Sequence, residues 1–388
     1  MPHHRIKVLQ LIFECHDRSH DPEELAEQIV AAFPRNEFEV TSAYLRGEPV
    51  NGQPQSLAEH VRYFRFPEAA LKGLRLSVKR TLLDYCAQEK FDVVICHRYK
   101  PVSLMMALNK KLHIPACIGV SHGFGEYKTL WRKLHARLSI DNRWHFVGVS
   151  SAVREHLIQQ ACGFTAENTT AIFNALDIET LEKMFLERKD ARQALELPAA
   201  ARIVGTIGRL VPVKGHIHLI RAFAQIAPAH PDAHLAIIGD GREAESLKAE
   251  IARHDLAQRI HLLGWRTRAK QYIRAFDILA IPSLSEGFSL ALLEGMSGRR
   301  PIIGSDIPAM APTIRAAGGL CVPPSDTDAL AKALSCYLAK PPEALTELGE
   351  QAYQYVRANH GIADYRAAYL RLTRQVLARG KQASSHRT

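Results

Sequence analysis

Short apolar runs rich in β-branched residues alternate with longer amphipathic segments twice along the chain, and this alternation limits the possible folds. The runs of the first half are residues 6–13, 92–97, 116–122, 145–150 and 170–175. Those of the second half are residues 202–208, 234–240, 260–265, 278–283, 301–306 and 319–324. Continuous apolar runs between helical segments are typical of parallel strands that are buried on both faces. The pattern therefore predicts two doubly wound α/β domains.

A charged, alanine-rich segment without a strand pattern, residues 177–201, separates the two sets of runs. We therefore expect a first domain over residues 1–178, a second over residues 179–361, and a terminal helix and tail over residues 362–388. With 388 residues, 47% of them hydrophobic, the chain has enough material for two cores of ordinary size. Because ligands bind beyond the carboxyl ends of the strands in such sheets, we expect functional residues there.

The seven cysteines include no C-x-x-C pair, which favours buried thiols over a disulfide framework or a structural zinc site. The chain has no run of about 18 apolar residues, and its first residues lack the cleavage pattern of a secretory signal. We therefore expect a cytoplasmic protein.

The first strand of the second domain ends at Gly208, and Arg209 and Lys214 follow before a helix. Two cations and a helix N-terminus at one strand end suit a diphosphate, although a solvated basic loop is the alternative. The next strand ends in a Gly-Asp-Gly turn around Asp240, which is a weak signal by itself. Neither a Walker A motif nor a complete G-x-G-x-x-G pattern occurs, so ATP hydrolysis and dinucleotide redox chemistry are disfavoured.

Another strand end carries two carboxylates eight positions apart, Glu286 and Glu294. We expect the first in a loop and the second in the second turn of a helix that begins near Ser289. Since the spacing does not make them a hydrogen-bonded pair, we expect them to contact different parts of one ligand. The backbone N–H groups of Ser289 and Leu290 would favour an anion at the helix start. Alternatively, Glu286 interacts with the helix dipole and Glu294 is a surface carboxylate.

The pattern Glu-Gly-Phe-Ser-Leu-x-Leu-Leu-Glu, preceded in order by Gly-Arg-Leu, Lys-Gly and Ile-Gly-Asp-Gly, resembles the large family of retaining GT-B glycosyltransferases that use nucleotide sugars. The resemblance is close over residues 203–339 and thinner in the first domain. It implies a GT-B fold, with two facing Rossmann-like domains and a C-terminal helix that returns to the first domain. It also implies a retaining hexosyltransferase with no metal and no cofactor, whose donor is a nucleotide diphosphate sugar, UDP-sugar favoured.

The resemblance also assigns roles to the residues that match the family's motifs. The residues expected to bind the donor are Gly208, Arg209, Lys214, Asp240, Phe288, Ser289, Leu290 and Glu294. Among them, Arg209 and Lys214 would hold the diphosphate and stabilise its charge as the sugar leaves, and Glu294 would bind the ribose hydroxyls. Glu286 would bind hydroxyls of the transferred sugar.

In the first domain, His122 matches the family's strand-end histidine near the reacting centre and is, with Glu286, the expected catalytic residue. His97 and Lys100 are expected on the acceptor side. Either histidine could instead be a hydrogen-bonded residue of the core. The chain departs from the family twice: it has no glycine over residues 13–21 after the first strand, and no acidic residue over residues 307–314. The acceptor pocket is therefore expected to be lined differently, and donor contacts near Asp306 are left open.

Positive charge is concentrated in residues 62–143, which contain 16 Lys or Arg against 6 Asp or Glu, whereas the rest of the chain is balanced. Two segments there combine cations with apolar residues at helical spacing, residues 71–83, with Leu71, Leu74, Val78 and Leu82 opposite the cations, and residues 127–138. Such basic amphipathic helices suit an anionic membrane surface, although ordinary solvated helices on the sheet are the alternative. Aromatic stacking platforms and nucleic-acid motifs are missing, which disfavours nucleic acid as a partner.

We therefore expect an enzyme at the inner face of the membrane whose acceptor is an anionic or lipid-linked saccharide, such as lipopolysaccharide core. Three alternatives keep the fold: a glycan phosphorylase, a nucleotide-sugar epimerase, and a non-catalytic module that binds a nucleotide sugar. A hydrolase that uses Glu286 and Glu294 as acid and base is disfavoured, because the two carboxylates are expected at the sugar and the ribose.

Overall fold

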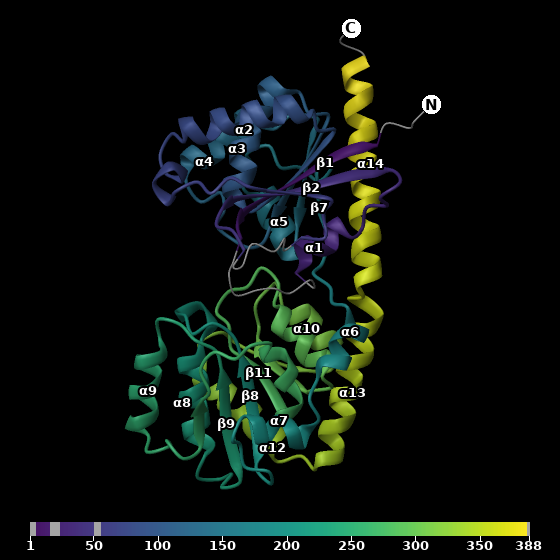
Figure 1. Ribbon diagram of the computed structural model, residues 1–388. Helices are drawn as coiled ribbons and strands as arrows, with labels where there is room; N and C mark the ends of the chain where they lie inside the picture. Colours follow the sequence, from purple (N-terminus) through teal and green to yellow (C-terminus); the bar gives the residue numbers. More distant parts are fainter. Residues whose placement is uncertain (1–4, 16–23, 50–55, 386–388) are drawn as a thin grey trace. The chain divides into compact units, whose positions relative to one another are not determined.

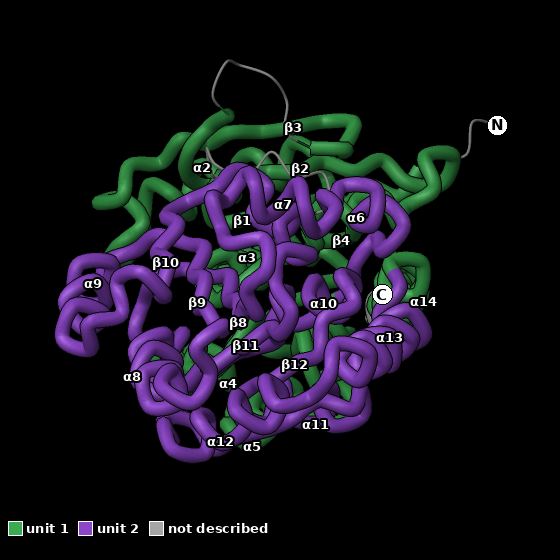
Figure 2. The backbone as a smooth tube through the Cα atoms, turned by 90° about the horizontal axis from the view of Figure 1, so that it is seen from below, with its two compact units in different colours: residues 1–174, 362–388 green, residues 175–361 purple. Residues whose placement is uncertain are grey.

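The structure is a computed structural model that describes residues 5–15, 24–49 and 56–385. The chain divides into two compact units, residues 1–174 with 362–388, and residues 175–361 (Figure 2). Each unit contains one sheet in which all strand pairs are parallel. The two doubly wound α/β domains predicted from the sequence are confirmed.

The sheet of the first unit has seven strands in the order β3-β2-β1-β4-β5-β6-β7. The strands are β1 (Ile6–Glu14), β2 (Phe38–Arg46), β3 (His60–Tyr63), β4 (Val93–His97), β5 (Ala116–Ser121), β6 (Trp144–Gly148) and β7 (Thr169–Ala171). Five of them were predicted, but β2 and β3 were not. Polar residues such as Thr41 and Ser42 interrupt the apolar pattern of β2, yet both are buried because β2 lies between β1 and β3.

In the described ranges, the helical segments that accompany this sheet are α1 (Leu25–Val30), η2 (Glu68–Leu71), α2 (Leu76–Glu89), α3 (Tyr99–Leu112), α4 (Leu130–Ser139), α5 (Ser151–Gln159) and α14 (Ile362–Ser385). The helices α2, α3 and α4 lie side by side, with α3 in contact with both others (Figure 1). Helix α14 contacts β5 and α1, and Tyr369 and Val376 on it are buried. The predicted return of the terminal helix to the first domain is therefore confirmed.

The sheet of the second unit has six strands in the order β10-β9-β8-β11-β12-β13. The strands are β8 (Arg202–Ile207), β9 (Ala233–Ile238), β10 (Ile260–Leu262), β11 (Ile278–Ile281), β12 (Ile302–Ser305) and β13 (Leu320–Val322). All six were predicted, and each ends earlier than its apolar run because the last residues of the run enter the following loop.

The helical segments of the second unit are α6 (Ile178–Met184), α7 (Arg188–Ala194), η3 (Pro212–Lys214), α8 (His216–Ile226), α9 (Ala244–Arg253), η4 (Ala269–Ala275), α10 (Leu290–Ser297), α11 (Ala311–Ala316), α12 (Thr327–Leu338) and α13 (Pro342–Asn359). The first part of the chain to belong to the first unit ends at residue 174 rather than at the expected 178, and the segment from residue 362 completes that unit. The difference at the boundary has a local cause, since Leu176 donates its backbone N–H to the carbonyl of His360, at 3.0 Å, within the second unit.

The cysteine thiols are all free, and five of the seven are buried, as predicted. Of the helices in the described ranges, none combines the length and the apolar character needed to cross a membrane.

Candidate functional site

The loop after β8 carries the two predicted phosphate-binding cations. Arg209 is exposed, and Lys214 lies in η3 directly before α8. Gly215 caps α8 with a φ of +67°, and a Cβ at this position would lie 2.1 Å from the carbonyl oxygen of Pro282. Only glycine combines this backbone conformation with so close an approach. The loop is therefore packed directly against the chain that leaves β11.

The Gly-Asp-Gly turn after β9 supports this loop from its other side. A Cβ on Gly239 would lie 1.8 Å from the carbonyl oxygen of Gly208. The N–H of Leu210 donates to the carbonyl of Asp240 at 2.9 Å, and the N–H of Gly241 donates to Oδ1 of Asp240 at 2.7 Å. The Gly-Asp-Gly motif, which is a weak signal in the sequence, therefore has a clear structural role, since it holds the backbone on either side of Arg209.

Lys214 and Glu286 form an ion pair, although they lie at the ends of different strands. Nζ of Lys214 is 2.5 Å from Oε1 of Glu286, and Oγ of Ser283 donates to the same oxygen at 2.8 Å. The Glu286 side chain is only 12% exposed. The sequence predicted a role for both residues but not their contact, and it did not single out Ser283.

Helix α10 begins where it was expected and separates the two carboxylates. Ser289 is its N-cap, Phe288 and Ser289 are buried, and the first helical residue is Leu290, so Glu294 lies in the second turn. Apolar residues of α10 pack onto the sheet so closely that a Cβ on Gly295 would lie 2.1 Å from Cδ2 of Leu279. This packing fixes the backbone N–H groups at the start of α10 near the carboxyl end of β11.

One buried residue near the loop was missed by the sequence reasoning. His216, the first residue of α8, is 2% exposed, and its ring approaches the backbone of Gly208. Burial lowers the pKa of His216 to about 4, against a smaller opposing effect of the Arg209 backbone. The imidazole is therefore neutral at neutral pH and adds no charge beneath the loop. Its place directly after Lys214-Gly215 was the only signal available in the sequence.

In the first unit, the structure brings the two predicted histidines together. His97 is the last residue of β4, and His122 directly follows β5. Nδ1 of His97 is 3.3 Å from Nε2 of His122, and Nε2 of His97 is 3.4 Å from Oε1 of Gln10 on β1. Three neighbouring strands of the sheet therefore contribute to one buried polar chain.

The protonation of this chain follows from its burial. Burial, and secondarily the Arg98 charge, lowers the pKa of His97 to about 4. Burial, and then the neighbouring His97 and Arg98, lower the pKa of His122, so both rings are neutral at neutral pH. The amide oxygen of Gln10 can only accept, so Nε2–H of His97 donates to it. Nδ1 of His97 then accepts from Nε2–H of His122. The remaining ring nitrogen, Nδ1 of His122, is a hydrogen-bond acceptor.

Glu126 lies next to this chain and is the second residue that the sequence reasoning missed. Its Oε1 accepts from the backbone N–H of His122 at 3.3 Å. Burial raises the pKa of Glu126 to about 7, although hydrogen bonds from Ser121 and His122 oppose the shift. Lys100, expected on the acceptor side, lies on α3 with Nζ 4.2 Å from the ring centroid of Phe13 near the end of β1.

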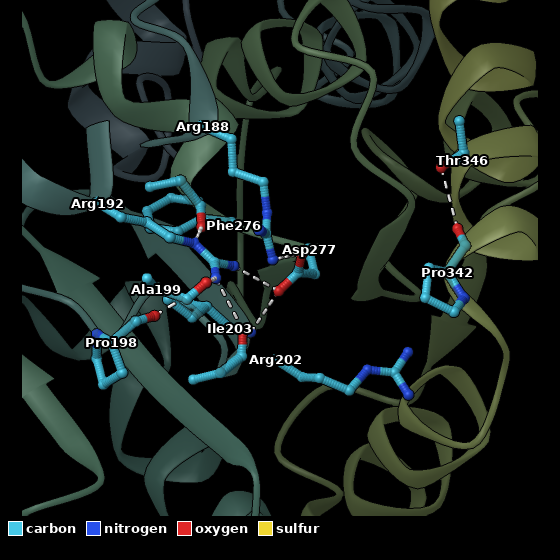
Figure 3. Close-up of polar contacts among 12 residues, drawn as sticks. Arg188, Arg192, Pro198, Ala199, Arg202, Ile203, Phe276, Asp277, Pro342 and Thr346 are labelled. Atoms are coloured by element: carbon cyan, nitrogen blue, oxygen red, sulfur yellow. Dashed lines mark hydrogen bonds and ion pairs between the residues drawn. The ribbon is translucent and has the colours of Figure 1, made fainter. Parts of the chain in front are cut away.

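A pocket of about 650 Å³ in the second unit lies away from these residues, near the amino ends of β8, β11 and β12. Its arginines bind the protein itself, and Figure 3 shows one of these contacts, from Arg188 to Asp277. Asp277 receives hydrogen bonds from Arg188 at 3.2 Å and from the buried Arg192 at 2.7 Å, and Arg202 bonds to a backbone carbonyl of Lys340. Because ligands of such sheets bind at the opposite, carboxyl ends, we read this pocket as structural.

Comparisons with known proteins agree with this geometry. The model of the family "Glycosyl transferases group 1" matches residues 187–355, and that of "Glycosyltransferase Family 4" matches residues 23–180. Together the two matches span most of both units. The chain belongs to the GT-B glycosyltransferases.

Among the relatives of this glycosyltransferase is the lipopolysaccharide core biosynthesis mannosyltransferase LpcC of Rhizobium leguminosarum, 33% identical over 45% of the chain and 51% of the relative. Another is a GDP-mannose-dependent monoacylated α-(1-6)-phosphatidylinositol monomannoside mannosyltransferase of Corynebacterium glutamicum, 27% identical over 65% of the chain and 68% of the relative. The match to LpcC thus spans about half of that protein's length.

Solved structures show the same fold over nearly the whole chain. Sucrose-phosphate synthase of Thermosynechococcus elongatus has a TM-score of 0.79 at 22% identity and covers 96% of this chain and 99% of its own. HepE of Anabaena in complex with UDP has a TM-score of 0.75 at 20% identity, with 95% and 99% covered. These likenesses confirm the predicted GT-B fold.

The two departures from the family have different outcomes in this glycosyltransferase. Most of the glycine-free stretch, residues 16–21, lies outside the described residues. Asp306 follows β12, and its Oδ2 is 2.6 Å from the guanidinium of Arg315 on α11, a cation close to the strand end. In the described ranges, no group of three or more His, Cys, Asp or Glu side chains lies together as metal ligands would.

Proposed function

We propose that the protein is a retaining hexosyltransferase that needs no metal ion. It transfers the sugar of a nucleotide diphosphate sugar, UDP-sugar favoured, to a membrane-associated saccharide such as lipopolysaccharide core or a lipid-linked glycan. The observation that carries the proposal is the meeting of Lys214 and Glu286, from the ends of β8 and β11, close to the start of α10. This arrangement offers a cation, a carboxylate and free backbone N–H groups to a single ligand.

The donor would bind at the carboxyl ends of the strands of the second unit. Arg209, Lys214 and the N–H groups of Ser289 and Leu290 suit a diphosphate, and Glu294 suits the ribose. The same cations would stabilise the negative charge that develops on the diphosphate as the sugar leaves. The solved complexes of HepE with UDP and with UDP-glucose support a nucleotide-sugar donor.

The ion pair between Lys214 and Glu286 gives the site a defined state before the donor arrives. A diphosphate would take over the ammonium of Lys214, and hydroxyls of the sugar would donate to the carboxylate of Glu286. Neither residue would then be left buried without a partner, which would cost free energy. Binding of the donor thus exchanges one set of polar contacts for another.

The acceptor would bind in the first unit, where Nδ1 of His122 can accept a hydrogen bond and His97 and Lys100 lie nearby. We assign no covalent nucleophile. The simplest route to retention is attack on the same face of the sugar, in which the departing phosphate oxygen takes the proton of the acceptor hydroxyl. The names of LpcC and the Corynebacterium relative support a saccharide or lipid-linked acceptor, and with it a place at the inner face of the membrane.

Thermal unfolding in the presence of UDP-, GDP- and ADP-sugars tests the donor. A ligand at 100 times its Kd stabilises the folded state by about 2.7 kcal/mol, so the true donor should raise the melting temperature clearly above the others. We then expect Arg209→Ala, Lys214→Ala and Glu286→Ala each to lower turnover by about 100-fold or more. Lys332→Ala, which removes an exposed cation of α12, is the control and should have no effect.

The double variant Lys214→Met/Glu286→Gln separates a structural ion pair from a donor site. If the two residues only stabilise each other, the double variant recovers activity that each single variant lost. If both contact the donor, it stays as inactive as the worse single variant. Near-normal turnover in two of the three alanine variants would refute the proposed donor site.

A further inference from the structure

Helix α4 presents its apolar side to solvent. Leu130 and Trp131 are 79% and 80% exposed, and Leu138 is 65% exposed. At 3.6 residues per turn these residues and Leu134 fall within an arc of about 100°, on the side opposite to the buried Ala136. The sequence left open whether this helix packs its leucines on the sheet, and the structure shows that they point away from it.

The approach to α2 exposes two further leucines. Leu74 and Leu76 are 76% and 69% exposed, on either side of Arg75, which has a φ of +53°. The sequence pattern placed Leu74 on one helical face with Leu71, Val78 and Leu82, opposite the cations. In the structure Leu71, Val78 and Leu82 are buried, whereas Leu74 is exposed. The reason is that α2 begins at Leu76 and not at residue 71, so the helical spacing does not extend to Leu74.

Cations surround these apolar residues. They are Lys128, Lys133 and Arg137 on or beside α4, Lys72, Arg75, Lys79 and Arg80 on or beside α2, and Lys110 and Lys111 on α3. The carboxylates on the same elements are Glu68, whose Oε1 is 2.9 Å from Nζ of Lys72, Asp84, and Glu89, whose Oε2 is 3.6 Å from Nζ of Lys7. We call the six apolar residues, Leu74, Leu76, Leu130, Trp131, Leu134 and Leu138, and these nine cations the α2–α4 face.

The elements that carry the α2–α4 face are neighbours in the first unit. Helix α3 contacts both α2 and α4, and the three lie side by side (Figure 1). His135 on α4 has a pKa lowered by burial and then by the charges of Arg75, Lys79 and Lys110, so cations from the other two helices lie close to α4. The helix is held from below, since the guanidinium of Arg132 lies 4.2 Å from the ring centroid of Tyr99 and donates to the carbonyl of Glu126.

We propose that the α2–α4 face docks onto a bilayer that contains anionic lipids. The leucines and Trp131 enter the boundary between head groups and acyl chains, while the cations bind lipid phosphates. The biological role of this docking rests on the proposed function, because docking would bring the acceptor-binding unit to an acceptor in the membrane. The physical argument, exposed apolar side chains ringed by positive charge, is independent of that function.

The charge of the α2–α4 face favours a bilayer as its partner over a second copy of the chain or a nucleic acid. A symmetric dimer through this face would bring nine cations against nine identical ones, whereas the centres of protein interfaces are depleted in charge. Nucleic acid would satisfy the cations but would leave five leucines in a polar, hydrated interface, and Trp131 is the only aromatic residue of the face. An anionic bilayer satisfies both kinds of side chain.

Co-sedimentation with vesicles tests the proposal on the full chain. We expect strong binding to vesicles of phosphatidylcholine with phosphatidylglycerol, weak binding to phosphatidylcholine alone, and a loss of binding as salt is raised. The fluorescence of Trp131 should shift to the blue on binding, and Trp131→Phe should abolish this shift while most binding remains. A Trp131 spectrum that does not change in bound protein would refute insertion.

Two sets of variants separate the insertion of apolar side chains into the bilayer from the electrostatic attraction of the cations to anionic lipids. Leu130→Ser/Trp131→Ser/Leu138→Ser should weaken binding by about tenfold or more, because it removes the inserted side chains. Lys128→Gln/Lys133→Gln/Arg137→Gln should weaken it by about 100-fold, at about fivefold per cation. Lys189→Gln/Lys332→Gln, two exposed lysines of the second unit, is the matched control and should bind normally. Unchanged thermal unfolding shows that each variant is folded, as expected for exposed sites.

The remaining outcomes refute either the docking surface or the proposed donor site, but not both. Equal binding of the apolar variant and the wild type, a dimer in light scattering that the apolar variant dissociates, or binding to duplex DNA in preference to vesicles would each refute the docking surface. Vesicle binding by a chain that binds no nucleotide sugar would leave the docking surface intact and refute the proposed donor site.

Discussion

At the scale of single residues, the sequence singled out candidate side chains but did not show which of them are in contact. His97 and His122 stood out as strand-end histidines, and Lys214 and Glu286 as members of different motifs. Their contacts depend on the neighbouring positions of β4 with β5 and of β8 with β11, which no spacing along the chain reveals. Glu126 and His216 were missed because their importance comes from burial next to a site, which the sequence does not display.

The substitution Glu126→Gln tests whether the raised pKa of the Glu126 carboxyl makes stability depend on pH. The pKa of Glu126 is raised from 4.5 to about 7 in the folded chain, so the unfolded chain loses its proton first as the pH rises. The contribution of Glu126 to the free energy of unfolding is therefore fully present below pH 4.5, and it falls by about 1.4 kcal/mol per pH unit until the folded group also ionises near pH 7. Glutamine does not ionise, so between pH 5 and pH 8 the variant should gain about 2.5 kcal/mol in its free energy of unfolding relative to the wild type.

Urea unfolding at the two pH values measures this difference. The lowered pKa values of His97 and His122 act in both proteins and cancel in the comparison. Glu155→Gln, an exposed carboxyl on α5, is the control and should show no such dependence on pH. An equal effect of pH on Glu126→Gln and the wild type would show that Glu126 does not ionise in this range.

At the scale of elements, the strands of the second unit were predicted almost completely, whereas β2 and β3 of the first were not. Strands in a sheet that helices cover on both faces must be apolar along their whole length, so their sequences are easily recognised. The loops at their carboxyl ends are shaped by close approaches between backbones, such as that of Gly215 to Pro282. A glycine in the sequence predicts such an approach only in general terms.

Gly215→Ala and Gly264→Ala form a matched pair, because the two glycines have φ values of +67° and +68°. A Cβ on Gly264 would have no heavy atom within 4 Å, so its substitution should cost only the left-handed conformation, about 1 kcal/mol. At Gly215 the contact of 2.1 Å with the Pro282 carbonyl is added, and we expect a loss of about 3 kcal/mol or more. Chemical unfolding of the two variants measures the difference. Equal losses would mean that the loop can move away from β11 at little cost.

At the scale of the whole molecule, the chain forms two units and returns to the first one at its end. The last helix belongs to the first unit because it contacts β5 and α1 there, and Tyr365, Tyr369, Val376 and Leu377 on it are all buried. Polar contacts fix its register, since Arg366 bonds to Oε1 of Gln28 at 2.9 Å. The stability of the first unit should therefore depend on residues at the far end of the chain.

Tyr369→Ala should destabilise the first unit by about 3–5 kcal/mol, as expected for a large, fully buried aromatic side chain. The second unit does not contain this residue, so the unfolding transition that responds to the nucleotide sugar should keep its midpoint. Calorimetry with and without the donor separates the two transitions. Arg371→Ala, an exposed position of the same helix, is the control. A common shift of both transitions would show that the two units unfold as one.

The sequence by itself determined the two doubly wound domains and the concentration of positive charge in residues 62–143, and it supplied the residues that we propose for the donor site. Local patterns predict these features, because strand burial, helix periodicity and motif spacing depend on residues that are close together along the chain. Only the tertiary structure decided that Lys214 pairs with Glu286, that His97 and His122 share a buried hydrogen-bond chain, and that the leucines of α4 face solvent. Contacts between residues far apart in the sequence, and the choice of which helix face meets the sheet, follow from the packing of the whole chain.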